Sequence, residues 1–432
     1  MKINIDPVIA ARIKQAWNNL PADQRNRIAP LILKAHQQAM TLSLTQAAPP
    51  TDPSVKHQLM FVRSALSNDQ DGLVNNLEAG VVVDVGPGGE IWGTGKYQQL
   101  DPGWAEAGAV WLENLVLGKH AFNNNPKTFT IPNAVQIAMA GDWGTGNWRT
   151  AANPAPSTDV GNHMKFLQTD LTVHLGDVYY AGTGDQEQHL LIGQPPGTVW
   201  PAGSLGALTL NSNHEMYSGA KPYFNQALTS SVFSVAVPPG PPPGPPQPQQ
   251  SSYFALENDN WVIVGLDSAY YSDAEGLYLD GSLYPSGGPQ VQLDFLRAQV
   301  ATGKKVIVLT HHNGITQDGK STTNLWSQVM SAFPANTGPA LWYWGHAHAA
   351  VVYTPQGPAN VPCRCCGHGA LPWGQASELA NNPNVVWYEH RSANDPDIPE
   401  RVLNGFAVLY LADDKVTEVF YDENGGVAWG SV

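Results

Sequence analysis

Short apolar runs recur along the chain from about residue 133, and they indicate its architecture. They span residues 135–140, 171–175, 206–210, 261–266, 305–310 and 340–344, and most end directly at Gly, Asp, Asn or His. Uninterrupted apolar runs of this length are typical of strands that are buried on both faces. Because active sites of α/β proteins usually lie in the loops at the carboxyl ends of such strands, we expect the chemistry in those loops.

Two further segments complete this picture. Residues 406–411 and 416–421 are apolar runs on either side of Asp413-Asp414-Lys415, a pattern that predicts a closing β-hairpin. Residues 238–250 are rich in proline, and we expect an exposed polyproline-type loop without a role in chemistry. A loop of this kind could instead dock a partner.

The N-terminal third shows helical patterns. Apolar residues at helical spacing fill residues 7–45, where Pro21 and Pro30 predict a division into short helices. A second helical stretch covers residues 104–117, after a strand-like run of valines at 81–83.

This region contains no recognisable chemistry. We therefore divide the chain into a mainly helical N-terminal extension, residues 1–132, and a catalytic domain, residues 133–432. We expect the extension to pack on the catalytic domain, and a separate binding role is the alternative.

Composition narrows the function classes. A net charge of −14 argues against a general nucleic-acid-binding surface, and no apolar run reaches the length that crosses a bilayer. The first residues lack a basic head followed by an apolar stretch, which favours a cytoplasmic location, while export of a processed form stays open. The three cysteines all lie in residues 363–366, and we expect free thiols in a tight loop rather than a disulfide or a metal site.

Metal-binding side chains follow the apolar runs in five short motifs. The motifs are Gly141-Asp142-Trp143-Gly144, Gly176-Asp177-Val178-Tyr179-Tyr180, Asn213-His214-Glu215, Thr310-His311-His312 and Gly345-His346-Ala347-His348. Carboxylate oxygen, amide oxygen and imidazole nitrogen together suit a pair of divalent or trivalent cations. Two neighbouring cations can activate a hydroxide and neutralise a phosphate group, so the motifs indicate a phosphate-ester hydrolase.

In this order the five motifs resemble the calcineurin-like metallophosphoesterase superfamily, over about residues 133–425. Most members open with Asp-x-His, but Gly144 stands where that His ligand would be. The second motif matches the Gly-Asp-x-x-Tyr form of purple acid phosphatases, whose tyrosine binds ferric iron, and its spacing selects Tyr180 over Tyr179. The first motif resembles the tartrate-resistant type of that family. The resemblance implies an αββα sandwich, two mixed β-sheets flanked by helices.

The resemblance also implies the roles of individual residues. The first metal, Fe(III), would be held by Asp142, Asp177, Tyr180 and His348. The second, a divalent iron, zinc or manganese, would be held by Asp177, Asn213, His311 and His346, with Asp177 bridging. His214 would contact the substrate phosphate or protonate the leaving group, while a metal-bound hydroxide attacks phosphorus.

Several residues near the motifs are not expected to bind metal. Ser212 stands where the family has glycine, and we expect only a slight change in that loop. Gly161-Asn162-His163 repeats the third motif but precedes the second and runs into a helical stretch, so we set it aside. His312 and His368 are possible substrate-pocket residues, and Asp267 is expected to be structural.

The sequence thus predicts a binuclear phosphoesterase that acts on small phosphomonoesters. A phosphodiesterase on cyclic nucleotides or glycerophosphodiesters is the nearest alternative, and a catalytically inactive binding scaffold is a further one. The substrate, the second metal and the oligomeric state are not predicted.

Overall fold

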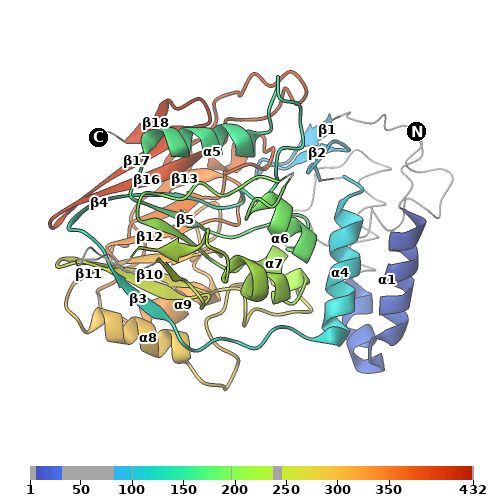
Figure 1. The fold of residues 1–432 in the computed structure, drawn as a ribbon, viewed down its shortest axis with the longest axis horizontal. Coiled ribbons are helices and arrows are strands. Elements are labelled where there is room, and N and C mark those ends of the chain that lie inside the picture. Colours follow the sequence, from blue (N-terminus) through green and yellow to red (C-terminus); the bar gives the residue numbers. More distant parts are fainter. Residues whose placement is uncertain (1–5, 32–81, 100, 196, 237–245, 431–432) are drawn as a thin grey trace.

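Two eight-stranded sheets form the centre of the protein in a computed structural model, which describes residues 6–31, 82–99, 101–195, 197–236 and 246–430 (Figure 1). The first sheet has the order β15 (Val385–Tyr388), β13 (Ala350–Tyr353), β14 (Cys363–Cys366), β12 (Leu341–Trp344), β11 (Lys305–Thr310), β10 (Trp261–Leu266), β9 (Phe254–Glu257) and β3 (Lys127–Thr130). The second has the order β18 (Val427–Gly430), β17 (Lys415–Asp422), β16 (Gly405–Ala412), β4 (Ala134–Ala140), β5 (Leu171–His174), β6 (Gly206–Thr209), β7 (Ser234–Val235) and β8 (Gln247–Pro248).

Helices flank the two sheets (Figure 1). Their bounds are α1 (Pro7–Asn19), α4 (Trp104–Leu117), α5 (Pro156–Leu167), α6 (Gly184–Leu190), α7 (Asn213–Tyr217), α8 (Val291–Val300) and α9 (Asn324–Met330). Short π- and 3₁₀-helical turns lie at Tyr223–Ala227 and Ser377–Leu379, and a separate hairpin joins β1 (Val82–Val85) to β2 (Ile91–Gly93).

Alternate side chains of each strand enter different hydrophobic layers. In β10, Ile263 packs between the two sheets, whereas Val262 and Val264 pack toward the helical layer of α8 and α9. In β4, Ile137 lies between the sheets and Ala138 lies on the side of α5. Both faces of these strands are therefore buried, which explains the uninterrupted apolar runs in the sequence and confirms the predicted αββα sandwich.

Parallel pairing brings the predicted motifs to one edge. Strands β4, β5 and β6 run parallel to one another in the second sheet, and β10, β11 and β12 do so in the first. The loops that follow each strand therefore leave from the carboxyl edge of its sheet, where the motif residues lie.

The predicted strands and the closing hairpin are confirmed with small shifts of their ends. β16 and β17 pair antiparallel across the predicted turn. Helix α1 begins at Pro7, where the side chain of Asp6 accepts the backbone N–H of Val8 at 2.8 Å. A second helical segment follows Pro21 and continues through Pro30 to residue 31, so Pro30 does not end it.

Three expectations need correction. Strand β3 pairs with β9, so the sandwich begins at Lys127, before the predicted boundary at residue 133. The three cysteines are free and buried as expected, but they lie on β14 and not in a loop.

The third correction concerns the proline-rich segment. Residues 237–245 lie outside the described residues, whereas its end pairs as β8. Gln249 is fully buried, and its amide bonds both the N–H and the carbonyl oxygen of Thr209 in β6. This end of the segment is therefore part of the sheet core and not an exposed loop.

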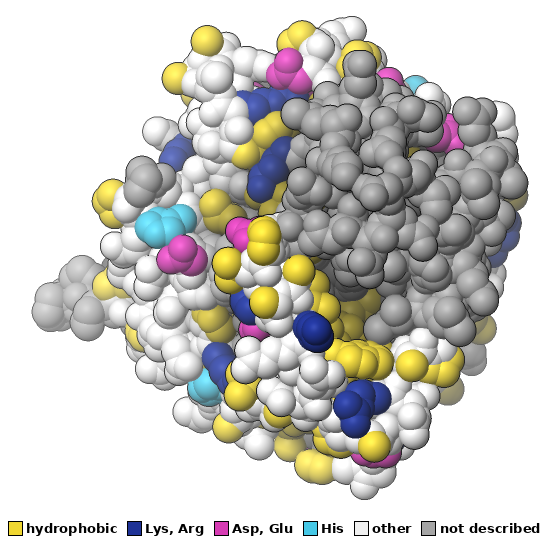
Figure 2. Space-filling view, turned by 90° about the vertical axis from the view of Figure 1, so that its right-hand side faces the viewer, with side chains coloured by type: hydrophobic (Ala, Val, Ile, Leu, Met, Phe, Trp, Pro, Cys, Tyr) yellow, Lys and Arg dark blue, Asp and Glu magenta, His cyan; other side chains and the backbone are white. Residues whose placement is uncertain are grey.

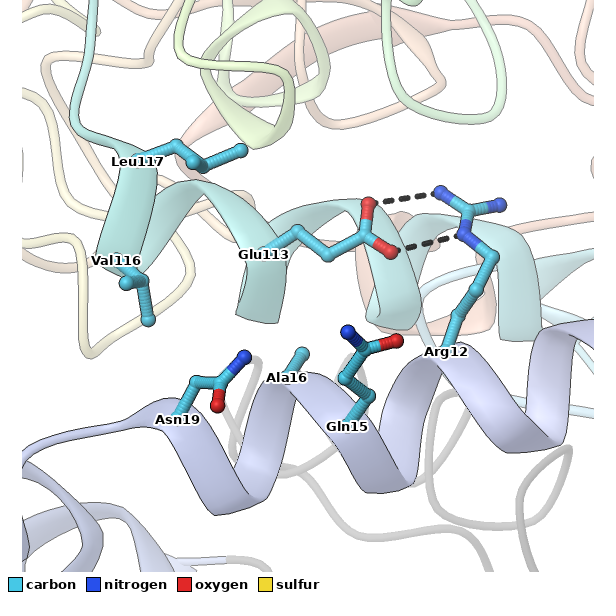
Figure 3. Close-up of a pocket in the computed structure, with 7 residues that line it drawn as sticks. All are labelled: Arg12, Gln15, Ala16, Asn19, Glu113, Val116 and Leu117. Carbon is cyan, nitrogen blue, oxygen red and sulfur yellow. Dashed lines mark hydrogen bonds and ion pairs between the residues drawn. The ribbon is translucent and has the colours of Figure 1, made fainter.

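Helix α1 packs lengthwise on α4 and leaves a groove of about 240 Å³ between them (Figure 3). The guanidinium of Arg12 donates two hydrogen bonds of 2.8 Å to the carboxylate of Glu113 across this groove. On the face that carries α1, hydrophobic side chains lie among scattered charged ones (Figure 2). Among the described helices, none is both long and apolar enough to cross a membrane.

Candidate metal centre

The first group of candidate ligands joins the loops after β4, β5 and β12. Asp142, Asp177 and His348 offer ligand atoms that all lie within 4.8 Å of one another, and all three side chains are buried. Nε2 of His348 is 3.1 Å from Oδ1 of Asp142. Two carboxylates and an imidazole at this spacing can hold one cation.

The second group lies on the other side of Asp177. Nε2 of His311 is 2.9 Å from Oδ1 of Asn213 and 3.3 Å from Oδ1 of Asp177. Nδ1 of His346 is 3.2 Å from the same Asn213 oxygen. Asp177 therefore faces both groups, and the structure brings six of the seven predicted metal ligands together, Tyr180 excepted.

Hydrogen bonds fix which atoms of the second group face inward. Nδ1 of His311 donates to the carbonyl oxygen of Leu175 at 2.8 Å, so Nε2 of the neutral ring carries a lone pair. The amide nitrogen of Asn213 donates to the phenol of Tyr217 at 3.2 Å, which turns Oδ1 toward the imidazoles. A lone pair of His311 thus converges with oxygens of Asn213 and Asp177, an arrangement that a cation between the three atoms would stabilise.

Burial sets the electrostatics of the two carboxylates. Burial and the neighbouring Asp177 raise the pKa of Asp142 well above its usual range. Burial alone would also raise the pKa of Asp177, but His214, His311 and hydrogen bonds hold it well below that range. The described ion pairs of these carboxylates are with histidines, so metal cations would complete the charge balance.

The backbone of the motif loops adopts conformations that ordinary residues avoid. Asp142, Asp177, His346 and His348 all have positive φ, between 51° and 80°. Gly176, at φ 100°, approaches so closely that a Cβ there would lie 2.8 Å from Nδ1 of His311. Such strain is common at functional sites, where surrounding structure holds it in place.

His214 lies beside the ligands without joining them. Its Nδ1 donates to the carbonyl oxygen of Tyr180 at 2.7 Å, and Nε2 lies 3.8 Å from Oδ2 of Asp177. Burial lowers the pKa of His214. The other ring nitrogen, Nε2, is thus the one that faces Asp177.

The tyrosine that reaches the centre is Tyr179 and not Tyr180, which corrects the expectation from motif spacing. The Tyr179 hydroxyl lies 3.0 Å from Oδ1 of Asp142, 2.9 Å from Oδ2 of Asp177 and 3.2 Å from Nε2 of His348. The Tyr180 hydroxyl instead donates to the carboxylate of Asp101. In the loop after β5 the two tyrosine hydroxyls thus have different partners. Residue spacing alone does not reveal which hydroxyl faces the ligands.

The ring of His312 is bonded to other protein groups. His312 lies near His311 and His346, but its Nδ1 bonds Ser268 at 2.9 Å and its Nε2 donates to the Tyr278 carbonyl oxygen at 2.7 Å. Both ring nitrogens are thus occupied, so we do not count His312 as a ligand despite its position.

His368 is buried in the loop after β14. Its ring packs toward Gly405 and Phe420, in the second sheet, rather than toward the ligands. His163 lies on α5 as expected, and Asp267 accepts the backbone N–H groups of Ala269 and Tyr270, a structural role.

Residues that the sequence analysis did not select also surround the centre. Asp101 and Trp104 come from the N-terminal extension, and the ring of Trp104 lies 5.8 Å from that of His214. Glu215 and Ser212 are fully buried behind Asp177, and the hydroxyl of Ser212 contacts both carboxylates. Ser212 therefore does more than fill the place of a glycine. Glu215 could have been found from its place in the third motif, whereas nothing in the pattern marks Asp101 or Trp104.

Among the comparisons with known proteins, only the comparison of structures finds proteins similar to this chain. No family model matches, and no curated protein matches. Among solved structures, the chain is similar to GAP50, the anchor in the inner membrane complex of Plasmodium, at 13% identity over 69% of this chain and 88% of that chain, with a TM-score of 0.44. It is also similar to a dimetal phosphatase from Danio rerio, at 12% identity over 67% of this chain and 96% of that chain, with a TM-score of 0.39. At these values the fold assignment rests on the sheet topology and the site on its own geometry.

Proposed function

We propose that the protein is a binuclear-metal phosphoesterase that hydrolyses small phosphomonoesters. The observation that carries the proposal is the position of Asp177 between two groups of buried ligand atoms. One carboxylate shared by two such groups is the arrangement that holds two cations about 3.5–4 Å apart. When bound, the cations would supply the positive charge that activates water and neutralises the phosphate and the leaving oxygen.

The ligands divide between two sites. Asp142, Asp177 and His348 would hold the first metal, with the Tyr179 phenol beside them as a further donor. Asp177, Asn213, His311 and His346 would hold the second. Because the second group is rich in nitrogen and neutral oxygen, it suits a divalent iron, zinc or manganese.

The phenol is the feature that relates this site to purple acid phosphatases. Gly144 removes the usual histidine of the first motif, and the Tyr179 hydroxyl lies among Asp142, Asp177 and His348. Burial and these carboxylates raise the pKa of Tyr179 well above its usual range, and a strongly charged cation beside the hydroxyl would favour the phenolate. We therefore propose Fe(III) as the first metal, with Tyr179 in the role first expected of Tyr180.

His214 is proposed to take up a proton on Nε2 from solvent when the anionic substrate binds and to give it to the leaving oxygen as the bond to phosphorus breaks. Its Nδ1 is bonded to the Tyr180 carbonyl oxygen, so Nε2 is the nitrogen left for this task. A general acid or base must lie within hydrogen-bond reach of the reacting group, and the proposal is supported by the 3.8 Å between Nε2 and Oδ2 of Asp177, the carboxylate next to which a phosphate between the metals would lie.

A paired assay tests the proposal. Protein purified without added metal is analysed for iron, zinc and manganese and is then assayed with p-nitrophenyl phosphate and bis(p-nitrophenyl) phosphate. We expect two metals per chain and faster turnover of the monoester. Faster turnover of the diester would replace the monoesterase proposal with a phosphodiesterase. Metal-loaded protein that turns over neither substrate would contradict the proposal that the protein is an enzyme.

A further inference from the structure

A short part of the N-terminal extension forms one side of the metal centre. We call residues 97–99 and 101–104 the wall segment. Its side chains Tyr97, Asp101 and Trp104 are buried, and the ring of Trp104 lies 4.7 Å from that of Tyr180. The Tyr97 hydroxyl donates to the carbonyl oxygen of Thr145, in the loop after β4, at 2.9 Å. The wall segment is therefore packed into the catalytic domain and is not a separate module.

Asp101 is the best-anchored residue of the wall segment. Its Oδ1 accepts the backbone N–H of Gly103 at 2.8 Å, and its Oδ2 accepts that of Tyr97 at 2.7 Å. The same Oδ2 accepts the hydroxyl of Tyr180. A carboxylate held by two backbone amides is a rigid acceptor, so it fixes the position of the Tyr180 ring.

Close packing on the other side of the ring reinforces this position. A Cβ at Gly103 would lie 2.5 Å from the Tyr180 hydroxyl, so only glycine leaves room for the phenol. The rings of Tyr97 and Trp104 lie 4.9 Å and 4.7 Å from the Tyr180 ring. The side chain of Tyr180 is thus fixed at its tip by a hydrogen bond and along its length by aromatic contacts.

The backbone of Tyr180 links the fixed position of its side chain to His214. Its carbonyl oxygen accepts the Nδ1 hydrogen of His214 at 2.7 Å, which selects the tautomer with a lone pair on Nε2 and aims that atom at the centre. Trp104 also contacts His214 directly, with ring centroids 5.8 Å apart. A shift of the Tyr180 ring would therefore change the orientation of the His214 imidazole.

From these contacts we infer that Asp101 and Tyr180 are positioning residues for His214, so that the N-terminal extension completes the active site. The inference rests on the proposed function, in which His214 exchanges a proton with the leaving group. Neither side chain is one of the proposed metal ligands. Their effect is on the orientation of one ring, and misplacement of a catalytic group by a fraction of an ångström costs turnover.

The test removes single hydroxyl groups. Tyr180→Phe deletes the hydrogen bond to Asp101 and keeps the ring, the carbonyl oxygen and the two backbone bonds of Asp101. We expect kcat for p-nitrophenyl phosphate to fall about tenfold, with KM within about twofold and metal content unchanged. Asp101→Asn should give a similar loss, and the double variant should lose little more, because both changes break one link.

Tyr270→Phe is the matched control. Its hydroxyl also ties the N-terminal extension to the sandwich, by a 2.5 Å hydrogen bond to the carbonyl oxygen of His120, but at a distance from His214. This variant should keep wild-type kcat. Equal losses in Tyr180→Phe and Tyr270→Phe would show a general effect of loosening the extension and would overturn the inference, as would an unchanged kcat in Tyr180→Phe.

A second readout is independent of turnover. In metal-free protein with ¹⁵N-labelled histidine, the Nδ1 hydrogen of His214 is identified by its loss in His214→Gln. We expect this signal to shift or exchange faster in Tyr180→Phe and Asp101→Asn but not in Tyr270→Phe. Wild-type protein without turnover would refute the proposed function alone, whereas an unmoved His214 signal would refute the positioning link whatever the activity.

Discussion

The hydroxyl of Tyr179 lies 2.9 Å from Oδ2 of Asp177, the carboxylate that faces both groups of candidate ligands. The neighbouring phenol of Tyr180 is turned away, toward Asp101. Two adjacent tyrosines thus have different partners, one among the candidate ligands and one at Asp101.

This difference predicts the optical properties of two variants. A phenolate bound to Fe(III) gives a charge-transfer band in the visible range, so oxidised wild-type protein should be pink to purple. Tyr179→Phe should bleach the band, whereas Tyr180→Phe should keep it, because only the first removes a donor near the metals. The visible absorption spectra of the iron-loaded proteins check this. The opposite result would return the ligand role to Tyr180, and colourless active protein with zinc or manganese alone would contradict the ferric assignment.

The shared carboxylate predicts a coupled loss of both metals. Asp177→Asn removes the negative charge that would hold two cations together, so we expect metal content and turnover to fall together, by about a hundredfold or more in turnover. Elemental analysis after gel filtration measures the metals. Asp185→Asn, at an exposed side chain on α6, is the matched control and should retain both. Retention of one full equivalent in Asp177→Asn would show that Asp177 serves a single metal.

His214 and His163 form a pair that separates a catalytic role from a sequence coincidence. His214→Ala should lower kcat about a hundredfold while both metals stay bound, because a proton-exchanging group is lost and no ligand is. His163→Ala, on the partly exposed surface of α5, should leave kcat unchanged. Steady-state kinetics with parallel metal analysis checks both. Loss of the second metal in His214→Ala would make His214 a ligand.

Burial of His368 predicts a pH-dependent stability. Burial lowers the pKa of His368 to about 3, below its ordinary value near 6.5. Between these values the unfolded chain binds a proton that the folded chain does not. The unfolding free energy therefore falls as pH decreases through this window, by up to about 1.4 kcal/mol per pH unit for this group. His368→Gln should reduce that slope by about one proton, measured by urea unfolding of metal-free protein between about pH 7 and pH 5. An unchanged slope would contradict the buried neutral state.

Gln249 predicts that the end of the proline-rich segment contributes to stability. Gln249→Ala would leave the buried N–H of Thr209 without its side-chain partner, while the carbonyl oxygen of Thr209 would keep the hydroxyl of Tyr223, and we expect a loss of about 2 kcal/mol in unfolding free energy. Gln250→Ala, at the next and exposed residue, should cost far less. Chemical unfolding of the two variants checks the difference. Equal stabilities would show that the buried amide contributes nothing.

Sequence pattern and tertiary structure determined different parts of this protein. The apolar runs determined eight of the sixteen strands in the two sheets, β4 to β6, β10 to β12, β16 and β17, because burial on two faces leaves a local signature in the chain. The order of the motifs predicted six candidate ligands that the structure brings together, since each follows a strand and parallel strands carry their loops to the same edge, as for Asp142 and His311.

Only the tertiary structure decided which neighbours complete the centre. Tyr179 and Tyr180 are neighbours in the sequence, so the residues around them do not distinguish one from the other. The path of the loop after β5 decides which phenol contacts Asp142. Asp101 reaches Tyr180 across a separation of 79 residues, and the sequence around Asp101 has no periodicity that marks the contact. Local patterns report which face of a strand or helix is buried, whereas contacts between distant segments depend on how the layers pack, and that information is distributed over the whole chain.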